Sequence, residues 1–265
     1  MSISTWMKTA HNNAGWLARH LGVVTVIVAM GLLAPAARAQ QFNSDNYLTM
    51  PYGTATFVVT HGQRSSTMIS SFALAPNWEF FVQAYLFWKD DTTGAAEHFS
   101  TNLYAKYMFV ENAAKTGGFA VMGGVGGNPG YYQRGELTNS FRTVWAASPL
   151  TLPFLGNKVL LDLMPGFEGD FDRGGSKTTS WLFTYSTRVA IYGIIPRSAI
   201  VAEVYGSTGQ GAPHSEYKAG VRWEPNPLFA LAVTYSAGLD GSPGAGAEAG
   251  FILFTPRFLC RGGCQ

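Results

Sequence analysis

The sequence has little charge, few cysteines and, beyond residue 39, no long apolar run. Only 13% of its 265 residues are charged, and its two cysteines both lie near the C-terminus. Two cysteines are too few for a structural zinc site, and the dispersed histidines form no metal motif. No stretch of 18 apolar residues follows residue 39, which excludes a protein that crosses a membrane with helices. We expect neither a metal nor a cofactor.

Residues 1–39 have no acidic side chain and are typical of an export signal. Two basic residues precede an apolar run over residues 21–33, and Ala37-Arg38-Ala39 is a small-x-small cleavage signature. An uncleaved membrane anchor is the alternative, but the run is shorter than the roughly 20 residues that a spanning helix needs. We therefore predict a signal peptide over residues 1–39, cleaved after Ala39, and one domain over residues 40–265.

The basic balance of the whole chain comes from this N-terminal segment. Residues 1–39 hold three of the 18 basic residues and none of the 16 acidic ones, so their removal changes the formal charge from +2 to −1. A chain with almost no net charge offers no global attraction for nucleic acid. We expect no nucleic-acid partner.

The segment 216–224 has the clearest pattern in the chain. Even positions carry the charged residues Glu216, Lys218, Arg222 and Glu224, interrupted by Gly220, and odd positions are apolar or aromatic. A period of two gives a strand with one ionic face and one apolar face. In an exported chain this favours an outer-membrane β-barrel with lipid outside and a polar lumen. A soluble periplasmic β-protein is the alternative.

Short β-branched and aromatic runs between Gly, Pro, Asn and Asp predict an all-β fold, a single antiparallel transmembrane β-barrel of about 12 strands. The strands are expected at 52–60, 65–74, 78–88, 98–110, 117–126, 136–147, 157–168, 178–191, 197–207, 215–224, 227–237 and 246–258. Ala75-Pro76-Asn77 and Pro225-Asn226-Pro227 predict tight turns. Longer loops are expected at 89–97, 128–135, 171–177 and 239–246.

Several predicted strands place charged side chains on the face that would line the lumen. These candidates are Glu79, Lys106, Arg142, Asp162, Arg188, Glu203, Glu216, Lys218, Arg222 and Glu224. Both signs of charge are present, and buried charges need partners. We therefore expect a structural ion network that pairs across strands, with the binding of a solute as the alternative.

Aromatic residues gather near the ends of the predicted strands. Trp78, Trp145, Trp181 and Trp223 are the main examples. Such positions are typical of the aromatic girdles at membrane interfaces, although packing within an ordinary sheet core would also explain them.

The C-terminal end carries two further predictions. The apolar run from Gly250 to Phe258 resembles the closing strand of outer-membrane proteins, through which the barrel-assembly machinery would recognise the chain, although Pro256 lacks an amide donor. Cys260 and Cys264 are candidates for a local disulfide, because export leads to an oxidising compartment. A terminal loop without chemistry is the alternative for these cysteines.

Four segments resemble the family of outer-membrane proteins grouped with the meta-pathway of phenol degradation. They are Asn102-Leu103-Tyr104-Ala105-Lys106-Tyr107, Gly123-Gly124-Val125-Gly126-Gly127-Asn128-Pro129-Gly130, Ala202-Glu203-Val204-Tyr205-Gly206 and Tyr217-Lys218-Ala219-Gly220-Val221-Arg222-Trp223. Their order and spacing are similar across most of the chain after residue 39. The resemblance implies a channel-like or transporter-like barrel that moves small hydrophobic or aromatic molecules inward, and it supplies no catalytic residues.

Two other functions stay open. A structural or surface barrel with a plugged lumen would show the same strand pattern. A lipid-modifying hydrolase is also conceivable, because His98, Ser100 and Asn102 share one face of a predicted strand and resemble the His–Ser–Asn set of outer-membrane phospholipase A. Here, however, the Asn follows on the same strand rather than on a neighbour.

We therefore expect a channel or transporter without enzymatic activity in the outer membrane of a Gram-negative bacterium. Its expected partners are outer-membrane lipid, the barrel-assembly machinery and a small solute.

Overall fold

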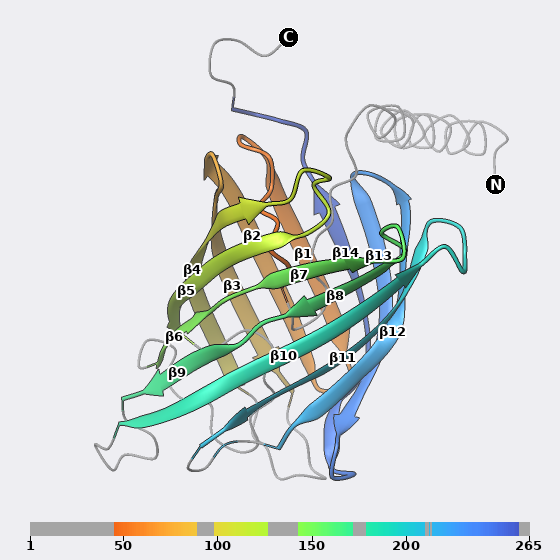
Figure 1. Ribbon diagram of the computed structural model, residues 1–265. Helices are drawn as coiled ribbons and strands as arrows, with labels where there is room; N and C mark the ends of the chain where they lie inside the picture. The colour runs from red at the N-terminus through yellow and green to blue at the C-terminus, as the bar shows by residue number, and fades with distance from the viewer. Residues whose placement is uncertain are drawn as a thin grey trace, which may run out of the picture.

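The computed structural model describes residues 45–88, 98–126, 143–171, 179–209, 212 and 214–259. This part of the chain forms one antiparallel sheet that curls into a barrel (Figure 1). Its strand segments are β1 (Ala55–Gly62), β2 (Ser65–Ala75), β3 (Trp78–Phe87), β4 (His98–Glu111), β5 (Gly118–Gly126), β6 (Thr143–Ala147), β7 (Leu150–Phe154), β8 (Val159–Leu163), β9 (Gly166–Asp170), β10 (Ser180–Tyr192), β11 (Ser198–Thr208), β12 (Glu216–Asn226), β13 (Phe229–Gly238) and β14 (Pro243–Phe254). Within the described residues no helix is long and apolar enough to cross a membrane.

These fourteen segments make twelve barrel strands, because two strands are each broken in the middle. β5 pairs with both β6 and β7, and β10 pairs with both β8 and β9. Pro149 and Pro165 lie in the two breaks, where a proline cannot donate to the ladder. The neighbouring amides still pair, Ser148 N–H to the Pro165 carbonyl at 2.9 Å and Met164 N–H to the Ser186 carbonyl at 2.8 Å.

The sheet closes on itself where the last strand meets the first. β14 pairs with β1 over seven residue pairs, from Thr56 opposite Phe254 to Gly62 opposite Glu248. A closed sheet has no edge strand with unpaired backbone groups. The predicted all-β fold, a closed antiparallel barrel of twelve strands, is confirmed.

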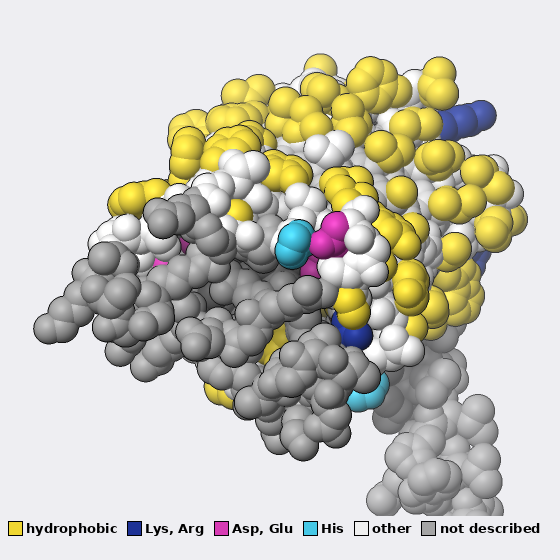
Figure 2. Space-filling view, turned by 90° about the horizontal axis from the view of Figure 1, so that it is seen from below, with side chains coloured by type: hydrophobic (Ala, Val, Ile, Leu, Met, Phe, Trp, Pro, Cys, Tyr) yellow, Lys and Arg dark blue, Asp and Glu magenta, His cyan; other side chains and the backbone are white. Residues whose placement is uncertain are grey.

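Side chains alternate between the two faces of the wall except where the ladder is bulged, as at Met108–Val110. In β12, Glu216, Lys218 and Arg222 are buried inside the barrel, whereas Tyr217 and Trp223 are exposed outside. Hydrophobic side chains gather over the outer wall in Figure 2. A polar interior with an apolar exterior reverses the arrangement of a soluble barrel and is the pattern of transmembrane β-barrels.

The predicted tight turn at Ala75-Pro76-Asn77 is confirmed, and the one predicted at Pro225-Asn226-Pro227 lies slightly later, because β12 continues through Asn226. Pro76 and Asn77 join β2 to β3, with Asn77 in the left-handed region at φ 63°. Pro227 and Leu228 join β12 to β13, where Leu228 N–H donates to the Asn226 side chain at 2.9 Å. Most of the predicted loops at 89–97, 128–135 and 171–177 fall outside the described residues.

Three boundary predictions are wrong. β7 was expected to be a connection, because Ser148-Pro149 reads as the end of a strand. The connection predicted at 239–246 is a four-residue turn, since Gly238 N–H donates to the Ser242 carbonyl at 2.8 Å and β14 begins at Pro243. The final strand ends at Phe254 rather than at Phe258.

Residues 255–259 run on past the end of β14 alongside residues 53–55, which lead into β1 (Figure 1). Thr255 N–H donates to the Ala55 carbonyl at 2.9 Å, and Phe258 N–H donates to the Gly53 carbonyl at 2.6 Å. Pro256, which has no amide hydrogen, lies in this segment.

Candidate lumen site

The N-terminal segment, residues 45–53, enters the barrel and reaches its wall before β1 begins, with Pro51 exposed. Asp45 and Tyr47 are each 3% exposed, and Met50 is 7% exposed. The Tyr47 ring packs so closely on the wall that a Cβ at Gly118 would lie 2.4 Å from it. No sequence pattern predicts this placement, because these residues have neither strand periodicity nor a motif.

One group of charges ties this segment to β3 and β4. Lys106 Nζ lies 3.0 Å from Asp45 Oδ2 and 3.6 Å from Glu79 Oε2. Glu79 also accepts hydrogen bonds from the Ser71 hydroxyl at 2.6 Å and from Met50 N–H at 3.2 Å. A buried ammonium is stable only with partners, and here one of its two carboxylates comes from the N-terminal segment.

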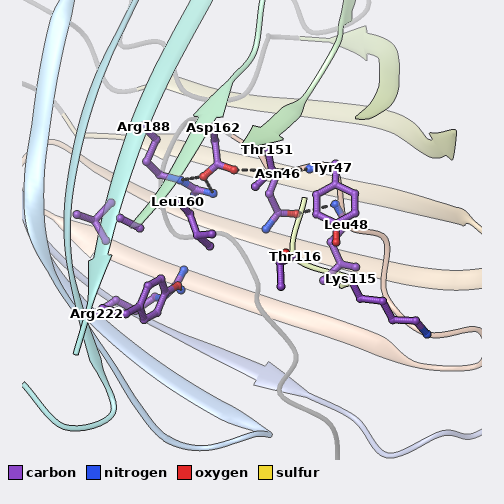
Figure 3. Close-up of a pocket in the computed structure, with 13 residues that line it drawn as sticks. Asn46, Tyr47, Leu48, Lys115, Thr116, Thr151, Leu160, Asp162, Arg188 and Arg222 are labelled. Carbon is purple, nitrogen blue, oxygen red and sulfur yellow. Dashed lines mark hydrogen bonds and ion pairs between the residues drawn. The ribbon is translucent and has the colours of Figure 1, made fainter. Parts of the chain in front are cut away.

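A second group, on β7, β8 and β10, contacts the same segment (Figure 3). Arg188 contacts Asp162 Oδ2 through Nη2 at 2.8 Å and through Nε at 2.9 Å. The Thr151 hydroxyl donates to Asp162 Oδ1 at 2.6 Å and accepts Tyr47 N–H at 3.3 Å. The segment is therefore hydrogen-bonded to this ion pair through one threonine.

Two cavities border the segment within the described part of the chain. One of about 30 Å3 lies between the second group and Arg222 (Figure 3), and a similar one lies beside Lys106 and Met50. Each has room for water. Among the described residues, Asn46, Leu48 and Met50 therefore occupy part of the lumen at this level.

A third group lines the remaining wall from β10 to β14. Lys218 pairs with Glu248 at 2.7 Å, and Glu216 accepts the Tyr205 hydroxyl at 2.8 Å. The Ser186 hydroxyl donates to Glu203 at 3.0 Å.

Arg222 contacts Glu224 at 2.6 Å and also donates to the Tyr192 hydroxyl. Glu224 is 24% exposed at its side chain, so this pair reaches the barrel rim.

The structure places most of the predicted lumen residues on the inward face. Those that are buried there are Glu79, Lys106, Asp162, Arg188, Glu203, Glu216, Lys218 and Arg222. The Lys106 group lies on β3 and β4, whereas Arg188 links Asp162 to Glu203, which lies opposite it on β11. Arg142, Cys260 and Cys264 lie outside the described residues.

Strand register explains which of these residues meet. Glu79 lies opposite Lys106, and Asp162 lies opposite Arg188. Sequence reasoning missed two partners, Asp45 and Glu248. Pairing β13 with β14 residue by residue would have placed Glu248 on the inward face. No pattern in the sequence identifies Asp45 as a lumen residue.

An aromatic cluster adds apolar surface to the inner wall. Phe81 and Tyr104 stack at 4.3 Å between ring centroids, and Tyr104 lies 5.2 Å from Trp145. Trp145 is 5% exposed and donates from Nε1 to Asn102 Oδ1 at 3.1 Å. Its predicted place in an interfacial girdle is therefore wrong, because it faces inward, whereas Trp78, Trp181 and Trp223 are exposed outside.

The hydrolase alternative gains no geometric support from the described residues. Asn102 accepts the indole N–H of Trp145 and donates to Gln83 Oε1 at 3.5 Å. Ser100 is buried on the inward face at 1% exposure, and the side chain of His98 lies outside the described residues. In the described part of the chain, no group of three or more His, Cys, Asp or Glu residues could hold a metal ion.

Solved structures with a similar fold are outer-membrane barrels. A crystal structure of an outer-membrane channel from Pseudomonas putida F1 matches 83% of this chain and 100% of its own, with 12% identity and a TM-score of 0.52. The NanC porin matches 76% and 97%, with 8% identity and a TM-score of 0.47. Outer membrane phospholipase A from Escherichia coli matches 84% and 95%, with 12% identity and a TM-score of 0.39. No protein-family model and no curated protein matches the sequence.

Proposed function

We propose that the protein is an outer-membrane channel for small hydrophobic or aromatic molecules, and that residues 45–53 close its lumen in the described state. Residues 1–39 would export the chain and then be cleaved. The apolar exterior and polar interior of a closed barrel support the membrane location. The similarity to the Pseudomonas putida channel supports the fold on which this function would be built.

The proposal rests mainly on one observation: a segment of the chain itself lies inside the barrel. A barrel of about eight strands is just wide enough for side chains to fill. This barrel has twelve strands, and a chain segment completes the filling. Its polar contacts with the wall are made by side chains and by single amides: they include Asp45 to Lys106, Met50 N–H to Glu79, Tyr47 N–H to Thr151 and the Tyr47 hydroxyl to Glu111. Its departure would leave a polar-walled passage without disturbing the β-sheet.

The residues of the inner wall also indicate which class of solute the channel would pass. Most of the charges named above lie in ion pairs or hydrogen bonds, so a charged solute would have to compete for their partners. The stacked Phe81 and Tyr104 rings and the nearby Trp145 offer apolar faces. A small neutral aromatic molecule fits this surface best, as the family resemblance also implies.

A structural barrel with a permanently plugged lumen is the second candidate. The two cavities of about 30 Å3 favour it, because neither would admit an aromatic solute. The two functions differ in whether residues 45–53 ever leave the lumen.

Uptake by intact cells tests the channel function. The protein would be produced in a Gram-negative strain that lacks general porins, and entry of radiolabelled phenol and of benzoate would be followed. We expect faster phenol uptake than in cells with an empty vector, with a smaller effect on benzoate. Unchanged phenol uptake, with a folded heat-modifiable barrel in the outer membrane, would contradict the channel and favour the structural barrel.

A further inference from the structure

The outer wall of the barrel contains a hollow of about 500 Å3 beside the two strand breaks. Trp78, Tyr107 and Phe167 are among its walls, and Ala146 and Pro165 also line it. Trp78 is 40% exposed and Phe167 is 61% exposed, so the hollow opens on the outside of the barrel. None of the groups described for the lumen uses this space.

Strand register shows how the hollow arises. Ala105 on β4 lies opposite Gly123 on β5, which lies opposite Ala146 on β6. This row of three small outward positions is bounded by Phe80 on β3 and by Phe167 on β9. A Cβ at Gly123 would come within 2.9 Å of the Trp145 carbonyl oxygen, so the centre of the floor has little room for a side chain.

The floor of the hollow is closed. Met122 and Ala147, which also border it, point inward and are 4% and 6% exposed. The ladder continues across the breaks through Ser148 N–H to the Pro165 carbonyl and Ala120 N–H to the Pro149 carbonyl, both at 2.9 Å. The hollow is therefore a recess in the outer surface of the wall, and it does not open into the lumen.

The chemistry and width of the hollow favour an apolar occupant. From β3 to β9 it crosses four interstrand spacings, or about 19 Å along the wall. Its described lining residues carry no charge, and Ser148, Tyr107 and Trp78 supply its polar side-chain atoms. Trp78 begins β3 next to a tight turn, so one end of the hollow lies near the barrel rim.

We infer that this hollow seats one acyl chain of a phospholipid from the surrounding membrane. The inference rests on the proposed insertion of the barrel into a bilayer. The hollow is continuous with the exposed apolar belt that the bilayer would cover, and filling it with hydrocarbon removes its apolar lining from contact with water.

Photolabelling of the full chain tests the site. The protein would be reconstituted into vesicles of phosphatidylethanolamine and phosphatidylglycerol that contain a phosphatidylethanolamine with a diazirine in its acyl chain. After illumination, labelled peptides would be mapped by mass spectrometry. We expect several-fold more label on β4, β5, β6 and β9 around the hollow than on outward residues of β12 and β13.

A matched pair of variants sharpens the test. Ala146→Phe fills the floor of the hollow and should reduce its labelling several-fold. Ala219→Phe adds the same ring at an exposed outward position of β12, away from the hollow, and should leave the labelling of the hollow unchanged.

Even labelling around the wild-type belt would overturn the inference, whether or not Ala146→Phe folds, and so would full labelling of the hollow in folded Ala146→Phe. Absence of label from the whole protein, together with failure to insert into vesicles, would overturn the proposed membrane channel as well.

Discussion

At the scale of single residues, Gly220 shows why the charged face of 216–224 has a gap. The residue faces inward between Lys218 and Arg222, where a Cβ would lie 2.2 Å from the carbonyl oxygen of Val233 on the next strand. The alternation could be read from the sequence, but the close approach of β13 could not. The interruption therefore reflects a lack of room for a side chain.

Substitution of this glycine should weaken the barrel. Gly220→Ala forces a methyl group against backbone, and overpacking of this kind costs about 1–3 kcal/mol. The neighbouring Ala219→Ser, on the exposed outer face, should change stability by no more than about 0.5 kcal/mol. Urea unfolding in micelles, followed by the gel shift of the folded barrel, would measure both, and equal midpoints would contradict this explanation.

The Lys106 group makes a second prediction at this scale. Lys106→Met leaves the buried carboxylates of Asp45 and Glu79 without their cation, and breaking a buried pair in this way costs about 3–5 kcal/mol. The chain that also carries Asp45→Asn and Glu79→Gln should recover most of that loss, because no buried charge remains unpaired. Unfolding free energies of the two chains would decide, and an equally unstable triple variant would argue against the pairing.

At the scale of elements, period-two patterning was enough to locate most strands and their faces. It failed where the chain departs from a regular ladder. β7 was missed because Ser148-Pro149 reads as a strand end, although the barrel tolerates the break. The predicted end of the final strand, Phe258, lies beyond Phe254 because hydrophobicity continues into the irregular segment that runs on beside residues 53–55. The position of residues 45–53 was not predicted, because a segment inside a lumen needs no regular alternation of polar and apolar residues.

β14, the closing strand, allows an inward-facing residue to be compared with an outward-facing neighbour. Phe254 is 6% exposed and belongs to an inner apolar cluster with Met50 and Ile252, whereas Leu253 is 42% exposed outside. Phe254→Ala should cost about 3–5 kcal/mol through a cavity in the lumen filling. Leu253→Ala should cost much less, because its side chain faces the surrounding detergent or lipid. A reversed order in detergent unfolding experiments would mean that the faces of β14 are assigned the wrong way round.

At the scale of the whole molecule, the outer belt sets the environment that the fold requires. Val233 is 65% exposed on the outward face of β13. Val233→Arg should cost about 2–4 kcal/mol in a bilayer, the penalty for a basic residue on the lipid face near mid-membrane. Leu239→Arg, in the turn between β13 and β14, should cost little.

Folding yield into vesicles compared with unfolding in micelles would measure this difference. Equal tolerance of both arginines in vesicles would contradict a bilayer around the belt.

The sequence predicted the barrel, its strand number and inward charges that pair across strands, because these depend on local period. It did not predict that residues 45–50 enter the lumen, because this depends on the width of the closed barrel and on the contacts of Asp45 and Tyr47. The proposed closure of the channel depends on that second feature.

Single-channel recording in planar bilayers tests the central claim most directly. Asp45→Asn with Tyr47→Ala removes the ionic and aromatic contacts of the segment and leaves the wall intact. Tyr217→Ala, at an exposed outward position, serves as the control. We expect small or rare openings for the native chain and for the control, and a larger, longer-lived conductance for the double variant. Identical recordings from all three folded proteins, or no conductance in any of them, would contradict a lumen closed by residues 45–53.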